Sequence, residues 1–481
     1  MAQIAVVGGG PKAVAIAAKA YALNSMGFSA PGIVIYEKDY IGAAWSGLGG
    51  YTDGDQALCT PAERDLGYPY DRASYGPDVA RFMFQRFSWH AFLVGRRARG
   101  SAYDDWVMHR RSPLAHRVFR DYLDAAAQLV IGSPRRPTGT ERKTGIVDAI
   151  DFDDQKNQWT VTWTERSTGL QQTADHDGVV ITGSGAPLQS LPGANRRVFD
   201  GEDFWRNLGL VVALLQNDRD PSVAIIGAGG TAAAVAYWFV RAGMRQIPIT
   251  IVSREPTLFA RHMHPFEDRL FTDSLAWNRL TDPAREQFAN RVTRGIVSET
   301  VLRGLEAGNI SYQSNIVSRF VPASSPSAPV ANAPPVPSIP ELDAELQDPE
   351  DPAVTIIEDF CRRNGYRPPP RPPAPPPRYL PATVFVDARG FNPWWFVGLL
   401  TNRSRQQHFA SRSMVTANID FTLSVGGQFP PGLHLPMLAS RQGPAAPNLM
   451  ALGWMSDRIL RNYVTPPPRQ FQGGGWNPLT E

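Results

Sequence analysis

The chain has 481 residues, of which 43% are hydrophobic, and this length is enough for about three domains of ~150 residues. Acidic and basic residues are interspersed and give a net charge of only +3, which argues against a nucleic-acid-binding protein, because such proteins carry a clustered basic face. The two cysteines, Cys59 and Cys361, form no C-x-x-C motif, so we expect neither a redox dithiol nor a thiolate zinc site of the usual spacing.

Two features bear on where the protein works. The first residues enter a strand without a basic leader, so no secretion signal is expected. The run Val223–Val240 has no charged residue and approaches the length of a membrane span, but Gly227, Gly229 and Gly230 interrupt it. We therefore expect a short strand and a buried helix in that run, and a cytoplasmic protein that contacts no membrane.

The first predicted element is a buried strand over residues 4–7 that leads into a glycine-rich turn. The turn reads Gly8-Gly-Gly10-Pro-Lys-Ala13, a G-x-G-x-x-A pattern, and an alanine-rich helix follows to about residue 26. A strand, turn and helix of this kind present the helix N-terminus to a pyrophosphate. A second strand over 33–37 ends in Glu37, close to the ~20-residue spacing of an acid that binds ribose hydroxyls. The alternative for Glu37 is a solvated carboxylate at a strand end.

The next elements complete the first nucleotide-binding unit. Residues 50–130 are irregular and then helical, and residues 144–165 alternate in the manner of a β-hairpin. A buried strand over 178–181 runs into Thr182 and Gly183. These two residues form a further turn at the end of a strand.

The second nucleotide-binding unit begins with a strand over 223–226. It continues with the turn Gly227-Ala-Gly229-Gly-Thr231-Ala232 and another alanine-rich helix. The following strand, over 249–252, ends in Ser253 and Arg254, where an arginine can bind a 2′-phosphate. An ordinary exposed arginine is the alternative. With Glu37 in the first unit and Arg254 in the second, we expect FAD in the first site and NADPH in the second.

The rest of the chain is less regular. Residues 284–308 are expected to be helical, whereas 321–340 and 366–378 are too rich in proline for regular β-ladders. We expect a surface insertion there, with one helix over 341–365. A late strand over 384–387 leads to a glycine turn at Gly390, and residues 448–463 predict a turn and a closing helix.

This order predicts an α/β fold with two Rossmann-like dinucleotide-binding domains, the second inserted into the first. The expected FAD-binding domain covers residues 1–195 and resumes over 381–481, which includes the C-terminal helix. The expected NADPH-binding domain covers 196–380 and carries the proline-rich insertion over 321–378. Two dinucleotides in one chain are what redox chemistry with a flavin and a nicotinamide needs.

Several short motifs resemble those of the class B flavin-dependent monooxygenases, and most of all their N-hydroxylating branch, which includes the lysine and ornithine N-monooxygenases. Gly42-Ala-Ala-Trp45 resembles the G-x-x-W of the class. The run Leu58–Leu66 resembles the segment L-Q-x-S-x-x-K-D-L of the ornithine enzymes. In that resemblance Arg64 stands for a lysine that assists flavin and cofactor binding, and Cys59 stands where the family has a flavin-contacting glutamine.

Three further segments extend the resemblance. Thr182-Gly183 and Ala388-Arg-Gly390-Phe391 are similar to the two A-T-G sites of the class, each with one departure. The run Glu267–Asp273 resembles D-D-S-P-F-V-N, whose asparagine touches substrate and NADP in the family. Asp273 occupies that position, so its carboxylate is a candidate to orient the substrate amine or accept its proton.

The resemblance implies an oxidoreductase of biosynthesis that uses FAD, NADPH and O2 to convert a small primary amine or amino acid into its N-hydroxy product through a flavin hydroperoxide. Family members are often dimers or tetramers, so a homo-oligomer is possible. Baeyer–Villiger or S-oxygenation on the same scaffold, an NADPH-dependent flavoprotein reductase and a flavin-binding sensor remain alternatives. A Baeyer–Villiger enzyme is disfavoured because Trp205 stands where its fingerprint needs a histidine after Phe199.

Overall fold

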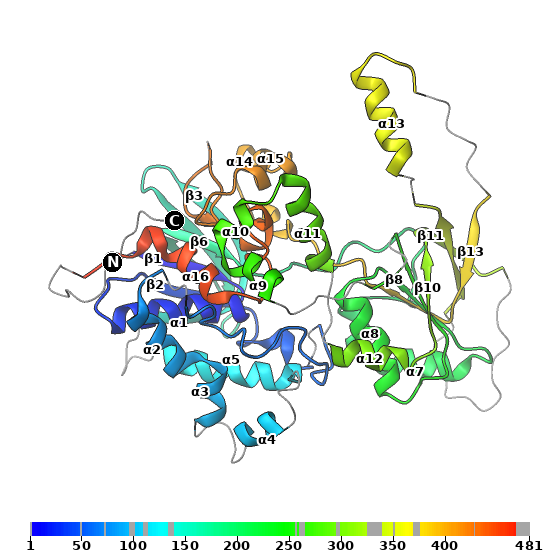
Figure 1. The fold of residues 1–481 in the computed structure, drawn as a ribbon, viewed down its shortest axis with the longest axis horizontal. Helices are drawn as coiled ribbons and strands as arrows, with labels where there is room; N and C mark the ends of the chain where they lie inside the picture. Colours follow the sequence, from blue (N-terminus) through cyan, green and yellow to red (C-terminus); the bar gives the residue numbers. More distant parts are fainter. Residues whose placement is uncertain are drawn as a thin grey trace. The chain divides into compact units, whose positions relative to one another are not determined.

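The chain divides into two compact units in a computed structural model (Figure 1). Unit 1 comprises residues 1–186, 261–293 and 391–481, and unit 2 comprises 187–260 and 294–390. The structure describes residues 2–48, 51–71, 74–95, 102–108, 114–132, 139–254, 257–258, 265–294, 299–324, 339–349, 352–368, 376–427 and 429–467.

Unit 1 is built on a seven-stranded sheet. The strand order across the sheet is β15 (Leu433–His434), β6 (Gly178–Ile181), β1 (Gln3–Val7), β2 (Gly32–Glu37), β3 (Thr140–Asp153), β4 (Gln158–Glu165) and β5 (Gln171–His176). The pairs from β15 to the start of β3 are parallel, and those from β3 to β5 are antiparallel. The buried β-branched residues of β1 and β6 suit strands that are covered on both faces. The predicted hairpin over 144–165 is confirmed.

Helices cover this sheet, and α1 is central among them because it packs against β2, α2, α5 and α16. Alanines make up much of α1, and they let neighbouring elements approach it closely. The helices of unit 1 are α1 (Pro11–Ser25), α2 (Pro77–Phe87), α3 (Trp89–Val94), α4 (Ala102–Met108), α5 (His116–Val130), α9 (Pro265–Thr272), α10 (Ser274–Asn278), α11 (Asp282–Arg294), α14 (Arg403–His408), α15 (Arg412–Ala417) and α16 (Leu452–Leu460).

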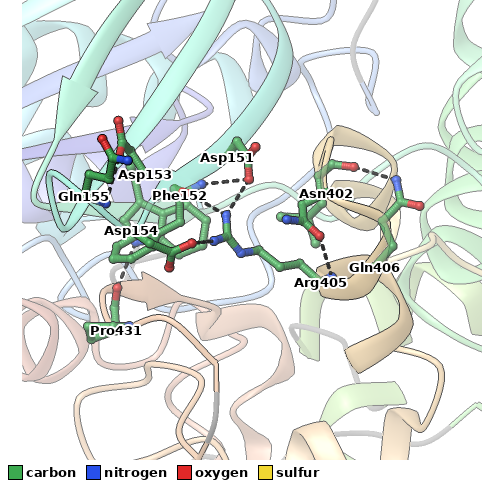
Figure 2. Close-up of polar contacts among 11 residues, drawn as sticks. Asp151, Phe152, Asp153, Asp154, Gln155, Asn402, Arg405, Gln406 and Pro431 are labelled. Atoms are coloured by element: carbon green, nitrogen blue, oxygen red, sulfur yellow. Dashed lines mark hydrogen bonds and ion pairs between the residues drawn. The ribbon is translucent and has the colours of Figure 1, made fainter.

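One arginine fastens the C-terminal part of unit 1 to the end of the β3–β4 hairpin (Figure 2). Arg405 of α14 donates to Asp151 Oδ1 at 2.5 Å and to the Phe152 carbonyl at 2.6 Å. Its other terminal nitrogen donates to Asp154 Oδ2 at 2.9 Å. The side chain is only 11% exposed. Because this guanidinium is largely buried and has three acceptors, it holds α14 to the β3–β4 hairpin.

Unit 2 contains a five-stranded sheet, all of it parallel. Its strands in spatial order are β10 (Ile310–Ser314), β9 (Ile249–Ser253), β8 (Val223–Ile226), β14 (Val384–Asp387) and β7 (Val198–Asp200). Its helices are α6 (Asp203–Arg206), α7 (Leu208–Asn217), α8 (Gly230–Arg241), α12 (Glu299–Glu306) and α13 (Pro352–Arg363). The units β1–α1–β2 and β8–α8–β9 repeat one design, so the predicted α/β fold with two Rossmann-like domains is confirmed.

Unit 2 also has an antiparallel sheet that the sequence did not indicate. It consists of β11 (Ile316–Pro322), β12 (Leu342–Gln347) and β13 (Arg378–Pro381), with β12 in the middle. We expected one helix over 341–365; α13 is that helix, but β12 precedes it. The strand escapes notice because Asp343 and Glu345 look solvent-facing, whereas both are buried and bonded to neighbours on β11 and after it. Residues 325–338 and 369–375 of the expected insertion lie outside the described part.

Two segments belong to a different unit from the one that the expected domain boundaries give them. Residues 261–293 fall within the expected NADPH-binding domain but cluster with unit 1. There, the aromatic residues of α9 to α11 pack on Ala445, Met450 and Ala451. Strand β14 falls in the expected third segment, yet it pairs with β8 and β7 in unit 2. Among the described residues, no helix combines the length and the apolar character that crossing a bilayer requires.

Candidate functional site

The first glycine turn joins β1 to α1 and leaves the start of the helix open. Gly8 has φ +100°, a conformation that side chains disfavour, and a Cβ there would lie 2.8 Å from Thr182 Oγ1. Gly10 is the N-cap of α1, and no side chain of the described residues caps the helix. A Cβ at Gly10 would meet nothing within 4 Å. The N–H groups of the first helical turn therefore face accessible space, which is the arrangement that binds an anion.

Glu37 ends β2 beside this turn. Its Oε2 accepts the Gly9 N–H at 2.6 Å and its Oε1 accepts the Asp39 N–H at 3.0 Å. The carboxylate thus holds the turn from the neighbouring strand. Carboxylate oxygens have further lone pairs, so this arrangement still allows Glu37 to accept ribose hydroxyls.

Thr182, after β6, closes the turn from the other side. Its hydroxyl donates to the Val7 carbonyl at 2.8 Å, and the Gly8 carbonyl oxygen lies 3.2 Å away. Gly183 follows it directly. The structure therefore brings together the glycine turn, Glu37 and the pair Thr182–Gly183, as the sequence predicts. Ala13 lies in the first turn of α1 and is fully buried, where it packs the helix against the sheet.

Trp45 and Cys59 have different surroundings. Trp45, in a short helix over 43–45, packs edge-on against His116 and Phe119 with ring centroids 4.7 and 5.2 Å apart. Cys59 is exposed. Their roles toward a flavin stay predictions.

The second glycine turn repeats the first between β8 and α8. Gly227 has φ +112°, and a Cβ there would lie 2.5 Å from the Ala388 carbonyl oxygen. Gly229 is the N-cap of α8, no side chain caps the helix, and a Cβ would again meet nothing within 4 Å. Thr231 is the second residue of α8. The same open helix N-terminus is therefore present in unit 2.

Ser253 and Arg254 lie at the end of β9, next to the strand that leads into the second turn. The side chain of Arg254 is exposed. The neighbouring Ser314 hydroxyl donates to the Arg254 carbonyl at 3.1 Å, which fixes the backbone there. An exposed guanidinium at this edge suits a phosphate ligand.

The turn after β14 lies beside the second glycine turn. Ala388 contributes the carbonyl that requires a glycine at position 227, and Gly390 has φ +110°. Arg389 pairs with Asp387 at 2.7 Å and donates to the Gln189 carbonyl at 2.7 Å. The segment that resembles the second A-T-G site thus supports the turn of unit 2.

Both turns fit a dinucleotide. In each, the glycine with positive φ touches a neighbouring strand end, whereas Gly10 or Gly229 borders open space that a side chain would fill. Within the described part of the chain, no side chain caps either helix N-terminus. The two turns differ in the charged residue at the end of the neighbouring strand, which is the acidic Glu37 in unit 1 and the cationic Arg254 in unit 2.

Arg64 forms a pair that the sequence did not reveal. Its Nη2 lies 2.6 Å from Asp268 Oδ2 on α9, and its guanidinium stacks 4.1 Å from the centre of the Tyr68 ring. The Arg64 side chain is 10% exposed, and burial lowers the pKa of Arg64 while Asp268 opposes that shift. Nη1 is buried and has no hydrogen-bond partner among the residues that the structure describes.

Asp273 lies between α9 and α10. Its Oδ1 caps α10 by accepting the N–H groups of Leu275 at 3.0 Å and Ala276 at 3.2 Å. Its Oδ2 lies 3.5 Å from Arg269 Nη2. Asp268 of α9 pairs with Arg64, and Asp273 follows the end of the same helix. Helix α9 therefore links Arg64 to Asp273.

Sequence reasoning also missed Lys12 and Arg458. Lys12 is buried within the first turn of α1, although its sequence context suggests a solvated lysine. Arg458 of α16 donates to Ser274 Oγ at 2.6 Å and stacks between Phe421 and Trp454. No local pattern in the sequence predicts contacts between such distant segments.

Comparisons with known proteins identify relatives of the whole chain. No family model matches the chain. It is 32% identical to the L-lysine N6-monooxygenase MbtG of Mycobacterium sp. (strain MCS) over 473 residues, which cover 95% of this chain and 94% of the relative. It is 29% identical to the enzyme of the same name from Mycobacterium tuberculosis (strain CDC 1551 / Oshkosh), with 97% and 96% covered.

A solved structure is similar over almost the whole chain. The lysine monooxygenase NbtG from Nocardia farcinica superposes with a TM-score of 0.71 at 26% identity, covering 95% of this chain and 99% of that one. The predicted FAD and NADPH dependence and the predicted N-hydroxylation of an amine or amino acid are thereby confirmed. The relatives favour N-hydroxylation over the alternatives of Baeyer–Villiger or S-oxygenation. With a third of its residues shared across nearly its full length, the chain belongs to the L-lysine N6-monooxygenase family, within the N-hydroxylating class B flavin-dependent monooxygenases.

Proposed function

We propose that the substrate is lysine and that its side-chain amine is the group that becomes hydroxylated. The observation that carries this proposal is the 32% identity, over 95% of the chain, to an L-lysine N6-monooxygenase. In such a reaction the cofactor performs the difficult chemistry.

The two glycine turns are proposed to hold the two cofactors. The turn at Gly8 and Gly10, with Glu37 and Thr182, would bind FAD, and the turn at Gly227 and Gly229 would bind NADPH. Support comes from their open helix N-termini and from Arg254, an exposed cation in position for a 2′-phosphate. When both are bound, FAD reduced by NADPH supplies the activation of O2 that side chains cannot provide.

The protein's own part is to bind the amine in its neutral form. A lysine amine has a pKa near ~10.4, so at neutral pH it must lose a proton before its lone pair can react. We propose that Asp273 orients this amine and accepts its proton, and that Arg64 supports the neighbouring cofactor and substrate groups. Both belong to an arrangement fixed by the Arg64–Asp268 pair.

The proposal extends to where the enzyme works. Two cysteines that form no disulfide in the described residues suit a reducing compartment, so we propose a cytoplasmic location. Assembly into a homo-oligomer stays a prediction.

The test is a substrate panel with the purified, FAD-loaded protein. L-Lysine, L-ornithine and cadaverine differ by one methylene or by the carboxylate, and NADPH oxidation is measured together with hydroxylamine formed. We expect hydroxylamine from L-lysine with the highest kcat/KM, since one methylene discriminates by roughly 10–200-fold. A higher kcat/KM for ornithine or cadaverine would refute lysine as the substrate. NADPH oxidation without hydroxylamine from any amine would remove the assignment of the reaction itself.

A further inference from the structure

Lys12 is a buried cation in an unfavourable place. It follows Pro11 at the start of α1 and is 4% exposed. The N-terminal end of a helix carries partial positive charge, so a lysine there is electrostatically disfavoured. Burial also lowers the pKa of Lys12 from 10.5 to about 7. An uncharged side chain could fill this buried position at lower cost, so we ask which negative group the charge of Lys12 binds.

Its partners in the protein are neutral. Lys12 Nζ donates to the Ala446 carbonyl at 2.7 Å and to the Asn448 carbonyl at 2.9 Å. In the described part of the chain, no carboxylate forms an ion pair with it. Lys19 differs from Lys12 in having a charged partner. It lies two turns further along α1 and pairs with Asp457 Oδ1 of α16 at 2.5 Å. Both lysines tie α1 to the C-terminal segment, but only Lys19 has a counter-charge there.

The diphosphate of FAD could supply the negative charge that Lys12 lacks within the described part of the protein. FAD carries a diphosphate with two negative charges, and a Rossmann-like unit holds such a group at the turn before the helix. That turn ends at Gly10, two residues before Lys12, and borders open space. Side chains in a helix lean toward its N-terminus, which directs the stem of Lys12 toward the turn.

We propose that Lys12 is an FAD-binding residue: its ammonium group balances the charge of the diphosphate and, through two carbonyls, holds residues 446–448 beside the cofactor. This inference rests on the proposed assignment of the first glycine turn to FAD.

The segment that Lys12 holds leads to the proposed substrate site. Ala445, Met450 and Ala451 flank the two acceptor carbonyls, and they pack in one cluster with Phe271 of α9 and Trp277 of α10. Asp273 lies between these two aromatic residues in the chain. Lys12 therefore connects the first glycine turn, through residues 446–448, to the cluster on which α9 and α10 pack.

The test compares neutral and charged variants by their affinity for FAD. Lys12→Gln keeps two N–H donors but no charge, Lys12→Met removes both, and Lys12→Arg keeps the charge. FAD is titrated into the apoproteins and its Kd is followed by flavin fluorescence. We expect Kd to rise by about tenfold or more in the Gln and Met variants, and by much less in the Arg variant. Lys19→Met is the matched control, which should lower the unfolding midpoint but leave Kd within about twofold.

Three results would overturn the proposal. The first is a Lys12→Gln protein that binds FAD with the wild-type Kd. The second is an Arg variant that loses FAD as fully as the Gln variant, which would mean that the shape of lysine and not its charge is needed. If the Gln and Met apoproteins did not fold, a wild-type Kd that stays constant as the pH rises well above 7 would contradict a charge contact, because the ammonium group of Lys12 loses its proton in that range. Gly10→Val separates the two assignments, because a Gly10→Val protein that still binds FAD rejects the turn itself, whatever Lys12 does.

Discussion

Arg64 Nη2 lies 2.6 Å from Asp268 Oδ2, and this pair joins two segments that the sequence alone would assign to different domains. Arg64 belongs to the loop that follows Cys59, and Asp268 belongs to α9. Both side chains are mostly buried, at 10% and 22% exposed. The pair therefore anchors the helix that precedes Asp273 on unit 1.

We expect Asp268→Asn to destabilise unit 1, because it leaves a buried guanidinium without its counter-charge. Breaking such a pair from one side costs roughly 3 kcal/mol, and urea unfolding would show a lower midpoint. Asp39→Asn is the control, since Asp39 pairs with Arg166 at the surface, where both side chains are well exposed, and its loss should change little. Equal midpoints for Asp268→Asn and wild type would show that the pair anchors nothing.

The two open glycines allow the cofactor sites to be blocked without disturbing the fold. Gly10→Val should abolish FAD binding, whereas Gly229→Val should keep FAD and prevent reduction by NADPH, because a side chain would occupy the space of a pyrophosphate. Absorbance of bound flavin and its bleaching by NADPH measure the two effects. A Gly229→Val protein that is folded but free of flavin would reverse the assignment. Gly227→Val is a poor choice, since its Cβ would clash with Ala388 and unfold the turn.

Arg254→Ala should reduce the preference for NADPH over NADH. A charge-assisted contact with the 2′-phosphate is worth about 2–3 kcal/mol, so KM for NADPH should rise by roughly 30–150-fold while KM for NADH stays constant. Steady-state oxidation of each coenzyme provides the measurement. The matched control is Arg245→Ala, an exposed arginine before the other end of β9. The same loss with both coenzymes would exclude a contact with the 2′-phosphate.

For Asp273, a pair of variants separates its charge from its capping role. Asp273→Asn keeps an acceptor for the N–H groups of Leu275 and Ala276, whereas Asp273→Ala loses it at a cost of about 1 kcal/mol. If the carboxylate holds the amine, the Asn variant should raise KM for the amine, leave flavin reduction by NADPH unchanged and release hydrogen peroxide. Coupling is read as hydroxylamine formed per NADPH consumed. Normal coupling in the Asn variant with loss only in the Ala variant would leave Asp273 as a helix cap.

The stability of unit 1 should fall as the pH drops from about 6.5 toward 4. Burial lowers the pKa of His434 to about 4, and this effect outweighs the opposing contact between its Nδ1 and the Thr422 carbonyl at 2.8 Å and the opposing charge of Asp420. Its Nε2 lies 2.9 Å from the Tyr463 hydroxyl. The folded protein therefore keeps His434 neutral where the unfolded chain would protonate it, so the stabilisation is complete above pH 6.5 and is lost below it. His434→Gln should flatten this slope in urea midpoints measured from pH 7 to pH 4. An unchanged slope would place the effect elsewhere, for example at His176, whose pKa is lowered to about 4 in the same way.

Local patterns predicted the nucleotide-binding units well. The turns at Gly8 and Gly227 follow buried strands, and the physical requirements of a tight turn and a free helix N-terminus leave few alternatives. Glu37 and Thr182 were found for the same reason, because parallel strands end at one edge of the sheet.

Long-range contacts were not predictable in this way. The location of α9 to α11 on unit 1 depends on Trp277 and Phe271 finding Ala445 and Met450, far along the chain. Strand β12 was missed because its burial depends on β11 and β13, which lie on either side of proline-rich runs. The burial of Lys12 could not be predicted from its neighbours in the sequence, because its ammonium group contacts carbonyls of the C-terminal segment.

The return of residues 261–293 to unit 1 has a consequence for how such an enzyme can be altered. The proposed amine contact at Asp273 and the coenzyme discrimination proposed for Arg254 come from neighbouring stretches of sequence, yet they fold into separate compact units. If both proposals hold, mutations in α9 to α11 that suit a longer or shorter amine fall in a different compact unit from the sheet that carries Arg254. We then expect that substrate range and coenzyme preference can be altered one at a time in a single chain.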